Sequence, residues 1–141
     1  MNKIIGATFF ASLLAGCSSG TAPHQTIHVE GAVVEASFNT TRAAKDDPHD
    51  SLVFGTLRIV GEGRIKSANL DCVALRLGNR LSEEIAVDSI ASILTDPFPA
   101  RDGRIFVEVY WVFPGVKLDA QDLTNARIEM LTKIDRCITY E

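Results

Sequence analysis

Three histidines, His24, His28 and His49, are the side chains whose ordinary pKa lies near neutrality. The first two fall in an N-terminal linker and an expected first strand, so we do not expect them to converge with the third. The loop Lys45–Asp50 surrounds the third with three carboxylates, those of Asp46, Asp47 and Asp50. Imidazole and carboxylate groups can ligate a metal, but one hydrophilic loop offers no scaffold to orient them. We therefore interpret this loop as solvated.

No nucleophile has a base beside it in a known catalytic pattern. The sequence contains no Gly-x-Ser-x-Gly, His-Glu-x-x-His, Cys-x-x-Cys or Gly-x-x-x-x-Gly-Lys motif. Glu83 and Glu84 are adjacent, so they point to opposite faces of a strand or diverge by about 100° on a helix. They make a poor acid–base pair. The sequence predicts a protein that is not an enzyme and needs no cofactor.

The three cysteines carry the remaining chemistry. Cys17 follows an apolar run of about 12 residues, Ile4 to Ala15, which begins after Lys3. That length suits the apolar region of a secretory signal and falls short of the roughly 20 residues of a membrane-spanning helix. The small polar segment after Cys17 lacks the cationic flank of a stop-transfer sequence. The alternative is an ordinary cleaved signal in which Cys17 has no role.

The four residues Leu14-Ala15-Gly16-Cys17 resemble the lipobox of bacterial prolipoproteins. The resemblance implies that residues 1–16 are a signal peptide and that the Cys17 sulfur carries a thioether-linked diacylglycerol. Two or three acyl chains, at about 0.8 kcal/mol per buried methylene, hold a protein on a membrane effectively permanently. Ser18, where an Asp would signal retention at the inner membrane, implies the inner leaflet of a Gram-negative outer membrane, facing the periplasm.

With Cys17 assigned to lipid, Cys72 and Cys137 remain as a pair. An even number of cysteines in an exported domain favours a disulfide, because the periplasm is oxidising. Closing the long loop between Cys72 and Cys137 would contribute about 4 kcal/mol to the stability of the fold in the chain-entropy description. Two buried free cysteines are the alternative.

Charge and composition bound the partners and the domain count. The formal net charge is −4 at pH 7, without a basic cluster, so we expect no nucleic-acid partner. Residues 17–25 have the composition of a flexible tether, and 26–141 suffice for one domain with a single core.

The elements that would position these residues are mainly strands, because apolar and polar residues alternate over most of the chain. The expected strands are Ile27–Phe38 with a bulge at Gly31, Ser51–Val60, Ile65–Leu77, Ile105–Phe113 and Ala126–Tyr140. Apolar residues on both faces of the third stretch indicate a strand covered on both sides or one that crosses between sheets. A helical stripe competes with the strand pattern in the last stretch.

The segment 82–94 fits two structures. As a helix it has Ser82 as N-cap and two glutamates in its first turn; as a strand it has Ile85 and Val87 on one face. The capping residues favour a short helix. Five or six strands then predict a mainly β fold, a small two-sheet β-sandwich of immunoglobulin-like or transthyretin-like arrangement, with room for that helix.

The strand Ile105–Phe113 has two faces. Trp111 and Phe113 continue the apolar face and are expected in the core. Phe106, Tyr110 and Val112 lie on the other face, which becomes an apolar patch suited to a partner if the segment 82–94 leaves it uncovered.

We therefore expect a lipid-anchored, non-enzymatic module for binding or assembly in the cell envelope. It would contact an envelope protein through a sheet edge or face. The alternative is a periplasmic lipoprotein that binds a small ligand or a metal through the Lys45–Asp50 loop.

Overall fold

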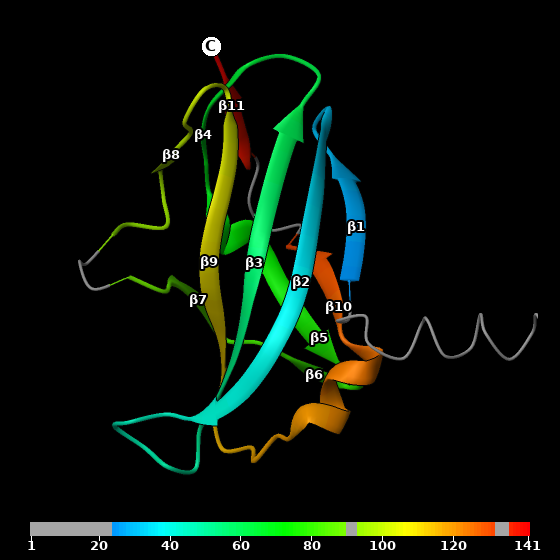
Figure 1. Cartoon of the computed structure of the whole chain (residues 1–141), viewed down its shortest axis with the longest axis vertical. Coiled ribbons are helices and arrows are strands. Elements are labelled where there is room, and N and C mark those ends of the chain that lie inside the picture. Colours follow the sequence, from blue (N-terminus) through cyan, green and yellow to red (C-terminus); the bar gives the residue numbers. More distant parts are fainter. Residues whose placement is uncertain (1–23, 90–92, 132–135) are drawn as a thin grey trace, which may run out of the picture.

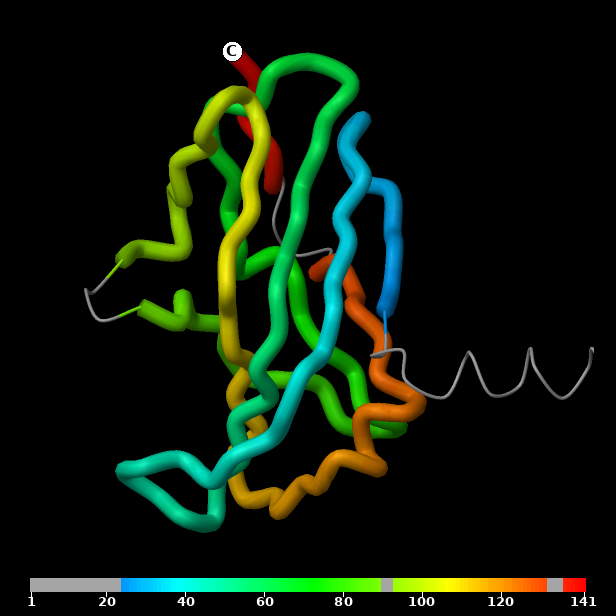
Figure 2. The backbone as a smooth tube through the Cα atoms, viewed as in Figure 1, coloured from blue at the N-terminus to red at the C-terminus, as the bar shows by residue number. Residues whose placement is uncertain are grey.

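The computed structural model describes residues 24–89, 93–131 and 136–141 (Figures 1 and 2). The lipobox and the expected lipidation site therefore lie outside the described residues. The strands are β1 His24–Val29, β2 Ala32–Ala43, β3 Ser51–Gly61, β4 Ile65–Ala68, β5 Val73–Leu77, β6 Arg80–Leu81, β7 Glu84–Val87, β8 Phe98–Pro99, β9 Arg104–Phe113, β10 Arg127–Met130 and β11 Ile138–Tyr140. Two short 3₁₀ helices, η1 Leu70–Cys72 and η2 Ala120–Asn125, complete them.

The strands form two layers, as Figure 1 shows. One layer is a five-stranded antiparallel sheet of order β1-β2-β3-β9-β7. The other consists of two three-stranded sheets, β10-β5-β6 and β11-β4-β8, side by side behind the first. Each inner face needs the other layer to bury its apolar side chains. The predicted mainly β fold, a small two-layer sandwich, is confirmed.

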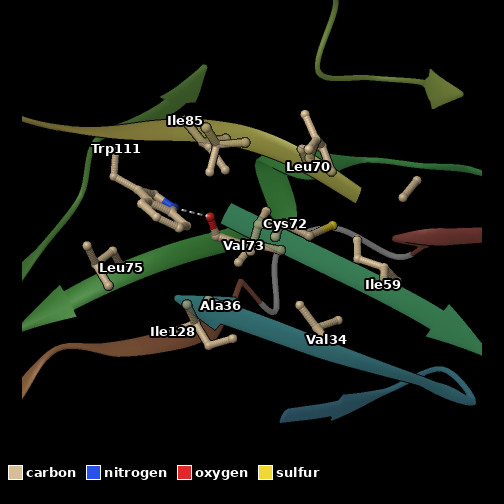
Figure 3. Packing of buried hydrophobic residues seen from close by; sticks show 14 of the residues in the cluster. Val34, Ala36, Ile59, Leu70, Cys72, Val73, Leu75, Ile85, Trp111 and Ile128 are labelled. Carbon is tan, nitrogen blue, oxygen red and sulfur yellow. Dashed lines mark hydrogen bonds between the residues drawn. The ribbon is translucent and has the colours of Figure 1, made fainter. Parts of the chain in front are cut away.

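The core lies between the layers and is built from alternate residues of β2, β3 and β9. Trp111 is fully buried at its centre, and its indole Nε1–H donates to the backbone oxygen of Val73 in β5 at 3.0 Å (Figure 3). Its ring meets the edge of Phe38 at 5.9 Å between centroids. Phe113 is also buried. Both core predictions for β9 are therefore confirmed.

Gly55 in β3 is buried beside the Trp111 ring. A Cβ at this position would lie 2.3 Å from the Ser37 backbone oxygen and 3.2 Å from the Trp111 ring. The register of the β2–β3 pair shifts just beyond, between Phe38 and Thr40. The glycine leaves the room that the indole occupies.

The first expected strand is in fact a hairpin. β1 and β2 are joined by Glu30 and Gly31, whose φ angles of 48° and 75° suit a two-residue turn. The phase slip at Gly31 thus marks a turn and not a bulge. β1 also begins at His24, so the last two residues of the expected tether belong to the sheet.

The third expected strand crosses between sheets. β4 pairs with β8 and β11, whereas β5 pairs with β6 and β10. The helix η1 separates them, with the Asn69 side chain accepting from the Asp71 N–H at its start. Of the two interpretations offered by the sequence, crossing is the correct one.

The favoured helix at 82–94 is wrong where the segment is described. Residues Glu84–Val87 form β7, with Ile85 buried opposite Trp111. The expected cap, Ser82, exchanges two hydrogen bonds with Leu75 instead: its N–H donates to the Leu75 oxygen at 2.8 Å, and its Oγ accepts at 2.9 Å. A side chain used in this way cannot cap a helix. Residues 90–92 lie outside the described part.

The last expected strand is two strands. β10 pairs with β5 in one sheet and β11 with β4 in another. The even-numbered side chains Ile128 and Ile138 are buried in both, so the alternation continues although the sheet changes.

Candidate partner-binding site

The predicted disulfide is present and joins Cys72 in η1 to Cys137 just before β11. Both residues are buried. The Glu30 carboxylate of the first turn accepts the Cys137 N–H at 2.9 Å, and the Cys137 oxygen accepts the Asn69 N–H at 2.8 Å. The disulfide thus ties the second layer together next to the hairpin turn of the first.

The three histidines do not converge, and carboxylates of the Lys45–Asp50 loop accept backbone hydrogen bonds. His24 and His28 are exposed on β1, at the far edge of the sheet from β7. In the loop, Asp47 Oδ1 accepts the His49 N–H at 2.9 Å and Asp50 Oδ1 accepts the Gly115 N–H at 2.8 Å. Within the described ranges, no group of three or more His, Cys, Asp or Glu side chains is arranged to hold a metal.

The three predicted partner-face residues point away from the second layer but do not form one patch. Tyr110 lies beside Phe54 with 5.5 Å between ring centroids, and both are half-buried. The Arg42 guanidinium lies 4.8 Å from the Phe54 ring centre. Val112 is likewise half-buried, opposite Leu52 of β3. This end of the face is covered by its own side chains.

Phe106 lies apart from this cluster. It lies four positions before Tyr110, about 13 Å along the strand, with the exposed carboxylate of Glu108 between them. The Phe106 side chain is 71% exposed. A large aromatic side chain that is exposed to water to this extent marks a candidate contact site.

The sheet edge beside Phe106 is open. β7 pairs with β9 over Val109–Val112, and its last bond is from the Asp88 N–H to the Glu108 oxygen at 2.8 Å. At the other end, Arg101 and Arg104 exchange backbone hydrogen bonds of 2.9 and 3.2 Å across the Asp102-Gly103 turn.

The backbone groups of Phe106 face that opening. Hydrogen-bonding direction alternates along an antiparallel strand. Arg104 and Glu108 both bond away from β3, so the N–H and C=O of Phe106, midway between them, point the same way. Among the described residues, no strand pairs with β9 at Phe106 on the side away from β3, and no loop or turn backbone bond reaches Phe106. One donor and one acceptor are thus presented at the edge.

A proline explains why the hairpin opens here. Continuing the Arg101–Arg104 pairing would place Pro99 opposite Phe106, and proline has no N–H to donate to the Phe106 carbonyl. β8 pairs with β4 instead, and the Ala100 N–H donates to the Lys66 oxygen at 3.0 Å. Figure 2 shows the yellow-green chain before β9 leaving the upper part of that strand.

The space between the two arms is an open hollow of about 780 Å³. Its apolar lining includes Ile93, Phe98 and Phe106, and its cations are Arg101 and Arg104. Ile93 is 42% exposed and its neighbour Leu94 is 73% exposed. Of the four large apolar side chains exposed in the described part of the chain, two, Ile93 and Phe106, therefore line this opening.

The charge at the hollow is positive. The described ion pairs join other residues, Arg58 to Glu35, Arg64 to Glu141 and Arg76 to Glu129, and leave Arg101 and Arg104 without a carboxylate partner. Asp102, the acidic residue of the lining, also acts on Arg64. The Glu141 side chain, by hydrogen bond and charge, raises the pKa of Arg64, and the Asp102 charge adds to that shift. Two cations thus face outward on a chain of net charge −4.

Sequence reasoning named Phe106 but missed the opening. The sequence signal for the opening is Pro99, on one arm of the Asp102-Gly103 hairpin, because a proline there prevents the two arms from pairing beyond the turn.

Neither short helix in the described part of the chain approaches the length and apolar character of a membrane-crossing helix. No protein family, curated protein or solved structure matches this chain.

Proposed function

We propose that the chain is a lipid-anchored lipoprotein of the bacterial envelope whose β-sandwich is a non-enzymatic binding or assembly module facing the periplasm. Cys17, at the end of the sequence that resembles a lipobox, would carry the lipid. The Cys72–Cys137 disulfide supports an oxidising compartment such as the periplasm.

One observation carries the binding role: two exposed apolar side chains, Ile93 and Phe106, line one opening in a sheet edge. Exposed apolar area and unpaired strand edges both favour unwanted association, so a folded domain ordinarily covers them. Finding both at one place supports a surface that a partner covers.

The tether limits where that partner lies. His24 is seven positions after Cys17, so the two residues are at most about 25 Å apart. A lipid on Cys17 would therefore keep the sandwich close to the membrane surface. The partner would be a membrane protein or a periplasmic protein that works beside the membrane.

Site-specific photo-cross-linking in native membranes tests the binding role. A photoreactive phenylalanine analogue at position 106 should give discrete adducts with an envelope protein, identified by mass spectrometry. The matched control is the same analogue at Thr26, an exposed position of β1. Equal adducts at both positions, or adducts only with the lipid-modifying and lipoprotein-trafficking machinery, would show that position 106 is no binding site.

Cys17→Ser tests the anchor. Without the thiol the lipid cannot be attached, so the protein should leave the membrane fraction or remain unprocessed. The unchanged chain should sediment with the outer membrane on a density gradient. A Cys17→Ser protein that is still processed and membrane-bound as before would refute the lipobox assignment.

A further inference from the structure

We infer that the opening beside Phe106 binds a short extended segment of a partner protein by strand addition, and that this segment carries acidic and apolar side chains. The inference rests on the proposed binding function and names the chemistry of the partner.

The backbone gives the mode of binding. The N–H and C=O of Phe106 face the opening between the Arg101–Arg104 bridge and the bond from Asp88 to Glu108. Arg104 and Glu108 are four residues apart, about 13 Å, which admits three or four residues of extended chain. A peptide laid there would use main-chain hydrogen bonds for affinity and side chains for selectivity, as in other cases of strand addition.

The side chains give the chemistry of the segment. The residue opposite Phe106 would project to the same face of the sheet, where an apolar side chain could pack on the exposed ring. Ile93 and Phe98 offer further apolar contact in the hollow. Arg101 and Arg104 lie at the same hollow without a carboxylate among the described side chains. Acidic residues at the end of the segment beside Arg101 and Arg104 would complete these two charges, whereas the other end of the opening carries the carboxylates of Asp88 and Glu108.

A second copy of the domain does not fit this opening. Its own Phe106 edge is bounded in the same way by the Arg101–Arg104 bridge and by Asp88, so two such recessed edges cannot meet. The segment 18–23 of this chain contains no acidic and no large apolar residue. The occupant is therefore a segment of a different protein whose flanks are free, such as a terminus or an extended loop.

Hydrogen exchange with a defined peptide tests the inference. The probe is the blocked pentapeptide Glu-Ile-Glu-Val-Glu, added to the full ¹⁵N-labelled chain in detergent micelles. Saturating peptide should slow exchange of the Phe106 amide at least about tenfold and leave the Tyr110 amide unchanged. Binding without slower exchange at Phe106, or no binding, would refute strand addition.

Two control peptides separate backbone from charge. Replacing the three glutamates by lysines should weaken binding at least about tenfold if the arginines select acidic side chains. N-methylation of the central backbone nitrogens should abolish the slower exchange at Phe106, because it removes the peptide's donors. Equal affinity of all three peptides would overturn the inference.

Substitutions at Phe106 also separate binding by the backbone from binding by the side chain. Phe106→Pro removes the edge N–H, and proline is tolerated where that N–H faces solvent; Phe106→Ala removes only the ring. The proline variant should bind the acidic peptide at least about tenfold more weakly than the alanine variant. Equal loss in both would show that only the side chain binds. If the proline variant fails to fold, the exchange of residue 106 in the alanine variant decides.

Charge variants complete the set. The pair Arg101→Gln and Arg104→Gln should abolish the preference for glutamate over lysine peptides, whereas Lys45→Gln, in a distant loop, should keep it. A persisting preference would refute the role of the arginines.

The membrane experiment distinguishes the two levels of the proposal. Adducts at position 106 without peptide protection of the Phe106 amide would leave the binding module standing and refute strand addition. Absence of both would refute the two together.

Discussion

The two halves of β9 have the same alternating pattern but different neighbouring strands. Both alternate buried and outward residues, and both pair with β3 along their whole length. The half that contains Tyr110 and Val112 also has β7 beside it. The half that contains Phe106 has an open edge between the turn and Asp88. Phe106 therefore lies at an open edge because no described strand pairs with this half of β9 on the side away from β3.

The open edge of β9 is short, which limits unwanted association with other chains. An exposed edge strand invites association with other chains, and proteins limit this with short edges, prolines and charges. Here the edge is bounded at both ends, Pro99 lines the hollow beside it, and Arg101 and Arg104 flank it. A long flat strand could not enter, whereas a short peptide could. The comparison indicates that the length of the gap limits how much of another chain can pair with this edge.

Amide exchange should give the largest difference between the halves. The amides of Ile105 and Val107 point toward β3 and that of Tyr110 toward β7, so they should open only with large parts of the fold. The Phe106 amide should exchange at least about a thousandfold faster than these, since global stabilities of about 5 kcal/mol or more protect core amides. Comparable protection at Phe106 and Ile105 would show that the edge is closed.

Alanine substitution should separate the halves by stability. Trp111→Ala should lower the free energy of unfolding by about 3–5 kcal/mol, because it empties the centre of the core and leaves the Val73 oxygen without its donor. Phe106→Ala should change it by less than about 0.5 kcal/mol, since that ring is largely exposed. Chemical denaturation with the disulfide intact measures both. Similar losses would contradict the difference in burial.

The outer face of the covered half should show a measurable side-chain pair. A double-mutant cycle of Phe54→Ala and Tyr110→Ala should give a coupling of about 0.5–1.5 kcal/mol for rings at 5.5 Å. The control cycle joins Phe106→Ala with Phe54→Ala and should give none, because the two rings lie in separate parts of the face. Coupling in the control alone would reverse the assignment.

The sequence predicts what local pattern determines. The Asp102-Gly103 turn, the strand after it and the burial of Trp111 follow from turn residues and alternation, and the structure has all three. The Cys72–Cys137 pair follows from counting cysteines once Cys17 is assigned to lipid.

Pattern fails where the answer depends on distant chain. A bulge and a two-residue turn both shift the apolar phase by one, so parity alone cannot distinguish them at Gly31. Ser82 resembles a helix cap until Leu75, seven residues earlier, takes both its N–H and its Oγ. Pro99 signals locally that the hairpin arms part beyond the Asp102-Gly103 turn, but the pairing of β8 with β4 that completes the opening depends on distant chain.

The smallest expected effect lies in the layer behind the covered half. The Arg76 guanidinium of β5 binds both carboxylate oxygens of Glu129 in β10, and this hydrogen bond, with the Arg76 charge, holds the pKa of Glu129 below its ordinary value. Glu129→Gln removes that interaction. The Arg76 pKa is raised by the same bond, so its charge stays constant over the acidic range.

The sign of the pH dependence follows from that shift. A carboxyl group whose pKa is lower in the folded state stabilises the fold above its unfolded pKa, and loses this contribution as the pH falls through the folded pKa. The stability difference between the unchanged chain and Glu129→Gln should therefore be small at pH 7, because both side chains are partly exposed, and should disappear as the pH falls through the folded pKa of Glu129. Denaturation across this range measures it. Amide exchange at Phe106 should not follow it, since β5, the strand that carries Arg76, is bonded through Val73 to Trp111 in the other half of β9. A parallel change at Phe106 would mean that the two halves open together.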